Sequence, residues 1–198
     1  MKKLLINLFF VLAVFGLAQA ELQENSSKTE GTGQGRPEFL GDPFLEAEYL
    51  FYSGDLLQAK LFYHDYLSQN PSGKKSHHAL YRLGEIDQSN HSYATALDFY
   101  QILLQDFPNS LLGNSARFNM AVCHFELAHF DLAEALFKKV LRSTPDKKQK
   151  WEIMVRLSWI DGSRMDYEKA FSRLKQVHGQ IENKEVRKRA VEIAEEFV

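Results

Sequence analysis

Residues 81–108 read YRLGEIDQSNHSYATALDFYQILLQDFP and contain two apolar patterns separated by a short polar stretch. In the second pattern, apolar residues such as Tyr93, Ala96 and Tyr100 recur every three or four positions, which places them on one face of a helix. Pro108 then ends the helix, because proline has no amide hydrogen and forces the residue before it out of the helical region. The stretch therefore predicts two amphipathic helices joined by a turn.

The same pattern recurs with a period of 37 residues. Prolines stand at this spacing, an alanine lies twelve residues before each, and an aromatic or large apolar residue follows each alanine by four positions. We expect the alanines to be buried and the second helix of each pair to end at Asn70, Phe107 and Thr144. The residues concerned are Pro71, Pro108 and Pro145; Ala59, Ala96, Ala133 and Ala170; and Tyr63, Tyr100, Phe137 and Leu174.

Small residues on the first helices follow the same period. They are Ala47, Gly84, Ala121 and Ser158. We expect each to face the periodic alanine of its second helix, because two small side chains let two helix backbones approach closely.

The second unit carries, in order, Leu83, Gly84, Tyr93, Ala96, Tyr100 and Pro108, and the third carries Ala121, Phe130, Ala133, Phe137 and Pro145. This order resembles the tetratricopeptide repeat, although the usual period of that family is ~34 residues. Within the family, the segments at 81–85 and 107–110 are similar to periplasmic repeat proteins of bacterial outer-membrane assembly and to Tol–Pal coordinator proteins. The resemblance implies an all-α fold, a right-handed α-solenoid of about four helix pairs over residues 41–182. Residues 183–198 are expected to form an amphipathic capping helix.

The first twenty residues differ in composition from the rest. Lys2 and Lys3 precede the apolar run Leu4–Leu17, and Ala18-Gln19-Ala20 has the form of a cleavage site. This pattern predicts a signal peptide over 1–20, with an uncleaved membrane anchor as the alternative. The polar residues 21–40 are expected to be a disordered linker. Because Glu21 rather than cysteine follows the cleavage site, we expect a periplasmic protein with no lipid anchor.

Charge and chemistry exclude several functions. Removing Lys2 and Lys3 leaves 22 basic and 26 acidic residues, so the exported chain carries 22 − 26 = −4 and is a poor candidate for binding nucleic acid. The seven histidines lack ligand spacing, and adjacent residues such as His77 and His78 point about 100° apart on a helix. No HExxH or GxSxG pattern is present, and Gly31–Gly35 belongs to the linker. Cys123 is expected in the core. We therefore expect no catalytic residue, no metal and no cofactor.

Surface recognition is the function that remains. In the resembling family, the first helices line a concave groove. The positions that carry over as candidate partner-binding residues are Phe51, His78, Tyr81, Arg82, Glu85, Asn119, Val122, Phe125, Arg156 and Trp159. Core packing is the competing interpretation for Tyr81, Phe118 and Val122. Arg82 and Arg156, two periods apart, are expected to be exposed charges that receive a carboxylate of the partner.

The sequence thus predicts a non-enzymatic, exported scaffold of the bacterial cell envelope that binds a protein or peptide segment in its groove. Two alternatives stay open. One is a hydrolase that uses histidine and aspartate residues in the groove, and the other is a structural component that assembles with itself through its end units.

Overall fold

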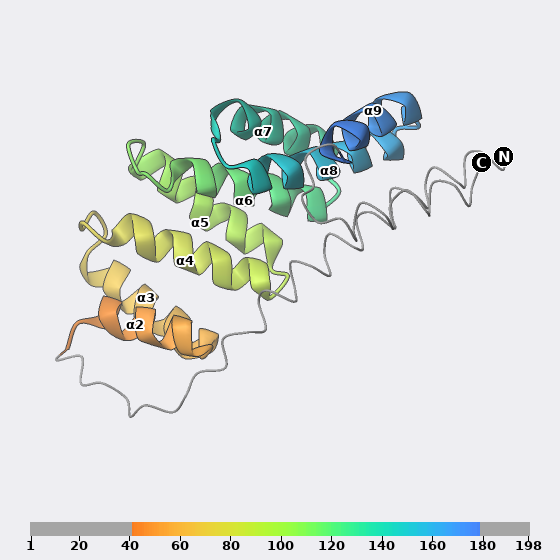
Figure 1. The fold of residues 1–198 in the computed structure, drawn as a ribbon. Helices are drawn as coiled ribbons and strands as arrows, with labels where there is room; N and C mark the ends of the chain where they lie inside the picture. Colours follow the sequence, from red (N-terminus) through yellow and green to blue (C-terminus); the bar gives the residue numbers. More distant parts are fainter. Residues whose placement is uncertain (1–40, 179–198) are drawn as a thin grey trace. The chain divides into compact units, whose positions relative to one another are not determined.

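A computed structural model of the protein describes residues 41–178 (Figure 1). Within this range the chain forms eight α-helices and no β-strand. The expected signal peptide, linker and capping helix lie outside the described residues. The helices are α2 (Pro43–Ser53), α3 (Leu56–Gln69), α4 (Ser76–Ser89), α5 (Tyr93–Asp106), α6 (Gly113–Glu126), α7 (Phe130–Ser143), α8 (Lys147–Ser163) and α9 (Tyr167–His178).

Two units make up the described chain. One ends at Val140 and contains α2 to α6 and most of α7, and residues 141–178 belong to the other. In the first unit, α2 packs on α3 and α4 on α5, and α3·α4 and α5·α6 contacts join successive pairs. Ring contacts of Phe118 with Phe137 and of Phe125 with Phe130 join α6 to α7. In the other unit, α8 packs on α9. The expected all-α architecture of consecutive helix pairs is confirmed.

The periodic residues occupy the core of these pairs. Ala59, Ala96 and Ala133 have no exposed surface, and Ala170 is only 2% exposed. The aromatic rings four residues later, at Tyr63, Tyr100 and Phe137, are also fully buried; the side chain at 174 is outside the description. The helices α3, α5 and α7 end immediately before Asn70, Phe107 and Thr144, so the predicted helix ends are confirmed as well.

In the second unit, the small residue Gly84 lies directly against a ring of the second helix. A Cβ atom added to Gly84 would lie 2.6 Å from Cζ and 2.8 Å from Cδ1 of Tyr100. Gly84 on α4 therefore makes room for the Tyr100 ring on α5, and the expected contact of Gly84 with Ala96 stays a prediction. Ala96 and Tyr100 are four positions apart and so lie on the same face of α5.

The turns inside the helix pairs share one backbone conformation. Gly54, His91, Ala128 and Met165 have φ of 87°, 58°, 59° and 64°, so a left-handed residue recurs every 37 positions. In three of these turns the next amide donates to the carbonyl five residues earlier: Ser92 to Asp87, His129 to His124 and Asp166 to Asp161, at 2.8, 2.8 and 2.9 Å. This is the Schellman ending of a helix.

Replacing Ala128 by glycine should stabilise the protein by about 0.5–1 kcal/mol. Alanine in the left-handed conformation costs about 1–2 kcal/mol, and glycine removes this cost from the folded state. The greater conformational freedom of glycine in the unfolded chain offsets part of that stabilisation. Ala135→Gly, at an exposed position of α7, removes the same methyl group and should instead cost about 1 kcal/mol. Urea denaturation of both variants checks the pair, and equal losses would contradict the role of the turn.

Two of the helices that lead into these turns carry a buried carboxylate four residues before the left-handed residue. Asp87 and Asp161 are 74 residues apart, twice the period, and are 2% and 1% exposed. Lys60 of α3 pairs with Asp87. Asp161 pairs with Lys169 and Arg173 of α9, at 2.6 and 2.5 Å. Each aspartate thus ties the end of a first helix to a second helix.

Candidate binding surface

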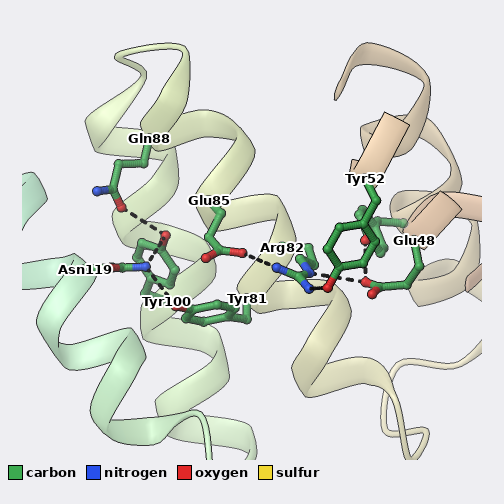
Figure 2. Close-up of polar contacts among 9 residues, drawn as sticks. Glu48, Tyr52, Tyr81, Arg82, Glu85, Gln88, Tyr100 and Asn119 are labelled. Carbon is green, nitrogen blue, oxygen red and sulfur yellow. Dashed lines mark hydrogen bonds and ion pairs between the residues drawn. The ribbon is translucent and has the colours of Figure 1, made fainter. Parts of the chain in front are cut away.

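Arg82 on α4 is the centre of a polar cluster that joins α2 to α4 (Figure 2). Its Nε lies 3.2 Å from Oε1 of Glu48, and its Nη1 lies 2.8 Å from Oε2 of Glu85. Its Nη2 donates to the hydroxyl of Tyr52 at 2.6 Å. Tyr63 donates to the same Glu48 oxygen at 2.5 Å. We call Glu48, Tyr52, Arg82 and Glu85 the Arg82 cluster.

The surroundings of Arg82 favour the charged form of its guanidinium, which lies between the carboxylates of Glu48 and Glu85. The guanidinium carbon lies 4.4 Å from the ring centre of Phe51 and 5.2 Å from that of Tyr52, as in cation–π contacts. Burial alone would lower the pKa of Arg82, but the carboxylates of Glu85 and Glu48 raise it above its ordinary value. The two carboxylates and one guanidinium leave the cluster with a net charge of −1.

A second set of polar contacts continues from α4 to α6 (Figure 2). Asn119 donates through Nδ2 to the hydroxyls of Tyr81 and Tyr100, at 3.2 and 3.1 Å. Tyr100 donates in turn to Oε1 of Gln88 at 3.1 Å. Burial, with the negative charge of Glu85, raises the pKa of Tyr81 to about 12, so its hydroxyl is neutral near pH 7.

Asn119 lies 37 residues after Arg82, and both side chains reach back to the preceding helix pair. Five predicted residues, Phe51, Tyr81, Arg82, Glu85 and Asn119, are therefore brought together by contacts across α2, α4 and α6. These contacts hold successive pairs in register. Whether the same residues contact a partner remains a prediction.

Other predicted residues lie elsewhere. Val122 and Phe125 are 6% and 7% exposed, so they are core residues rather than groove lining. The ring of Phe125 packs on Phe130 at 6.0 Å, because its position on α6 faces α7. His78 is exposed, with its ring 4.5 Å from that of His77.

Arg156 and Trp159 belong to the unit of residues 141–178. The expectation that Arg156 is an exposed charge is wrong: it is 6% exposed, and its Nη1 lies 2.7 Å from Glu152 one turn earlier on α8. Its buried Nε has no hydrogen-bond acceptor among the described residues. Trp159 is half-buried on the same helix.

Glu48 and Tyr52 were not among the predicted residues. Glu48 lies 37 residues before Glu85, so the period alone could have identified it. Tyr52 has no such signal, because the equivalent positions hold Ser89 and Glu126. Tyr52 is 71% exposed although its hydroxyl is bound to Arg82.

The described residues show no arrangement that favours hydrolysis. Among the described residues, a ring nitrogen of His91 contacts the Tyr93 hydroxyl, and one of His124 contacts His129. No group of three or more His, Cys, Asp or Glu side chains in this part of the chain could hold a metal ion. Burial raises the pKa of Cys123 to about 12, which keeps its thiol protonated. None of the helices described combines the length and apolar character needed to cross a bilayer.

Residues 78–110 match the family model of the tetratricopeptide repeat. The matched segment contains most of α4 and all of α5, and with them Arg82, Glu85 and the Gly84–Tyr100 contact. Among solved structures, the chain is similar to a candidate protein-binding protein from Bacteroides ovatus, at 17% identity and a TM-score of 0.41, over 81% of this chain and 100% of that one. No curated protein sequence matches the chain.

The tetratricopeptide match covers the helix pair α4–α5. The first polar contact network extends from the matched repeat back to α2 through Glu48 and Tyr52, and the second extends forward to α6 through Asn119. The candidate surface is therefore the first-helix side of the matched repeat and its two neighbours.

Proposed function

We propose that this chain is a non-enzymatic protein-binding scaffold and that the Arg82 cluster is part of the surface that binds the partner. The observation that carries the proposal is an exposed aromatic ring on a rigid polar support. Tyr52 is 71% exposed, while its hydroxyl is held by Arg82, whose side chain is 19% exposed and bound to two carboxylates. A large ring that is already ordered loses little conformational entropy when a partner covers it.

The fold supports the same proposal. Stacked helix pairs present an extended surface that repeat proteins commonly use for binding. Tyrosine and arginine are enriched among the residues that dominate binding energy at protein interfaces. The family match over α4 and α5 agrees with a protein partner.

The charge of the partner differs from the expectation drawn from the sequence. A free Arg82 would favour a carboxylate, but this guanidinium is neutralised by Glu48 and Glu85, whose side chains remain 24% and 28% exposed. The net charge of −1 favours a segment that offers a lysine, an arginine or neutral donors beside an apolar group.

We also propose that the scaffold acts in the bacterial cell envelope after export. The support is the sequence of residues 1–20 together with the family resemblance. Mass spectrometry of the protein from an envelope fraction tests this: the proposal requires a chain that begins at Glu21. A chain that retains Met1 to Ala20 would contradict cleavage and favour a membrane anchor.

Tyr52→Ser should weaken capture of the partner by about tenfold or more, because it removes the exposed ring and its bond to Arg82. Leu57→Ser is a matched control, since Leu57 is 72% exposed but lies on the second helix α3. The measurement is quantitative mass spectrometry of envelope proteins retained by the immobilised chain. Equal retention by both variants and the unchanged chain would contradict the assignment of the surface.

A further inference from the structure

Two histidine rings meet at the turn between α6 and α7. Nδ1 of His124 and Nδ1 of His129 lie 3.5 Å apart, and the ring centres are 5.7 Å apart. The residues are five positions apart, which is not the spacing of neighbours on a helix. For that reason their spacing alone does not predict a common ligand.

The backbone of the turn sets this contact. Ala128 is left-handed, with φ of 59°, and its amide donates to Phe125 at 3.0 Å. The amide of His129 donates to the carbonyl of His124 at 2.8 Å. In this Schellman ending, the side chains at the positions of His124 and His129 commonly touch. The backbone of the turn therefore brings the two residues together.

The separation of the two nitrogens fits one shared ion. Histidine nitrogens bind zinc at ~2.0–2.1 Å, so two nitrogens 3.5 Å apart subtend about 115–120° at the metal, close to a tetrahedral angle. We propose that His124 and His129 chelate one divalent transition-metal ion, of the class of Zn²⁺, Ni²⁺ or Cu²⁺, through their Nδ1 atoms. The remaining coordination positions are open to water or to a donor from another molecule.

The surroundings of His124 favour a bound cation. His124 lies in the last turn of α6, where the unpaired carbonyl groups give the helix end a partial negative charge. Burial, together with the neighbouring His129, lowers the pKa of His124, so the unprotonated ring that metals require is present at neutral pH. Imidazole is a common ligand of zinc, copper and nickel.

The equivalent turns lack this pair of donors. The corresponding residues are Leu50 with Asp55, Asp87 with Ser92, and Asp161 with Asp166. Asp87 and Asp161 are already paired with lysine or arginine side chains. Among the turns described, the one between α6 and α7 is thus the turn with two imidazoles. This site is separate from the Arg82 cluster and does not depend on the proposed binding function.

Zn²⁺ titration of the untagged, chelator-treated chain tests the proposal. The ring resonances of His124 and His129, followed by nuclear magnetic resonance, should shift together and saturate with the first equivalent. His124→Gln and His129→Gln should each weaken the first binding event by about tenfold or more in calorimetry. The double variant His77→Gln, His78→Gln removes the other neighbouring histidine pair and should leave the first event unchanged.

Two results would overturn the proposal. One is a first event that persists at full affinity in the His124→Gln, His129→Gln double variant. The other is a first equivalent that shifts other histidine rings while those of His124 and His129 stay in place. The second result needs no substitution, so it decides the matter even if a variant fails to fold.

Discussion

Gly84→Ala should lower the free energy of unfolding by about 2–3 kcal/mol. The added methyl carbon would lie 2.6 Å from Cζ of Tyr100, a separation that forces the ring or a helix to move. Tyr100 is fully buried, so the ring has no free space, and overpacking of this kind typically costs ~1–3 kcal/mol. Urea denaturation of the purified variant gives the number directly.

Gly113→Ala is the control for this prediction. An added Cβ there would lie 3.3 Å from the flexible end of Arg117 and 3.7 Å from Cδ2 of Leu104, so it fits with a small adjustment. Gly113 is helical, where alanine is favoured over glycine, and we expect no loss of stability. Equal effects at both glycines would contradict the close packing of α4 on α5.

Lys60→Met should cost about 2–3 kcal/mol. The Asp87 side chain is 3% exposed and its Oδ2 has no hydrogen-bond partner, so Lys60 supplies its compensating charge. Removing one member of a buried pair typically costs ~3–5 kcal/mol, and we take a lower value because the Lys60 side chain is 32% exposed.

The same substitution at an exposed pair provides the comparison. Lys138 lies 2.6 Å from Glu134 on α7 and is 50% exposed, so Lys138→Met should cost less than about 1 kcal/mol. Adding Asp87→Asn to Lys60→Met should restore part of the lost stability, because it removes the unpaired charge. Equal losses for the two lysine variants in urea denaturation would show that Asp87 does not depend on Lys60.

The repeat period predicted the buried helix contacts and the helix ends, because each depends on one residue type at one position. Alanine is the residue that lets two helices touch, and proline cannot continue a helix, so Ala96 and Pro108 predict a contact and an end without further information. The alanine burial and the three helix ends follow the prediction for this reason.

The remaining features depend on which side chain reaches which neighbour. Gly84 accommodates the Tyr100 ring, a contact that the periodic small residues alone did not predict. In three of the four turns the left-handed position is occupied by His91, Ala128 and Met165, none of which is the glycine typical of this conformation. His124 and His129 meet only because of that turn.

The candidate surface shows the same limit. Arg82 and Arg156 occupy equivalent positions, yet Arg82 bridges to Glu48 on the preceding first helix and Arg156 pairs with Glu152 on its own helix. Equivalent positions in a repeat share a backbone environment, but the partners of a charged side chain depend on the residues that surround it. Periodicity therefore predicts which residues share the first-helix face, but it does not predict the partners of their charged side chains.

Site-specific photo-crosslinking tests the central claim, that the first-helix face binds a protein, most directly. A photoreactive phenylalanine analogue replaces Tyr52 in one variant and Leu57 in the other; these positions are 71% and 72% exposed on α2 and α3 of the same helix pair. On irradiation in cells, we predict a discrete adduct with another polypeptide from position 52 and none from position 57. Adducts from position 57 alone, or from neither position, would contradict the account.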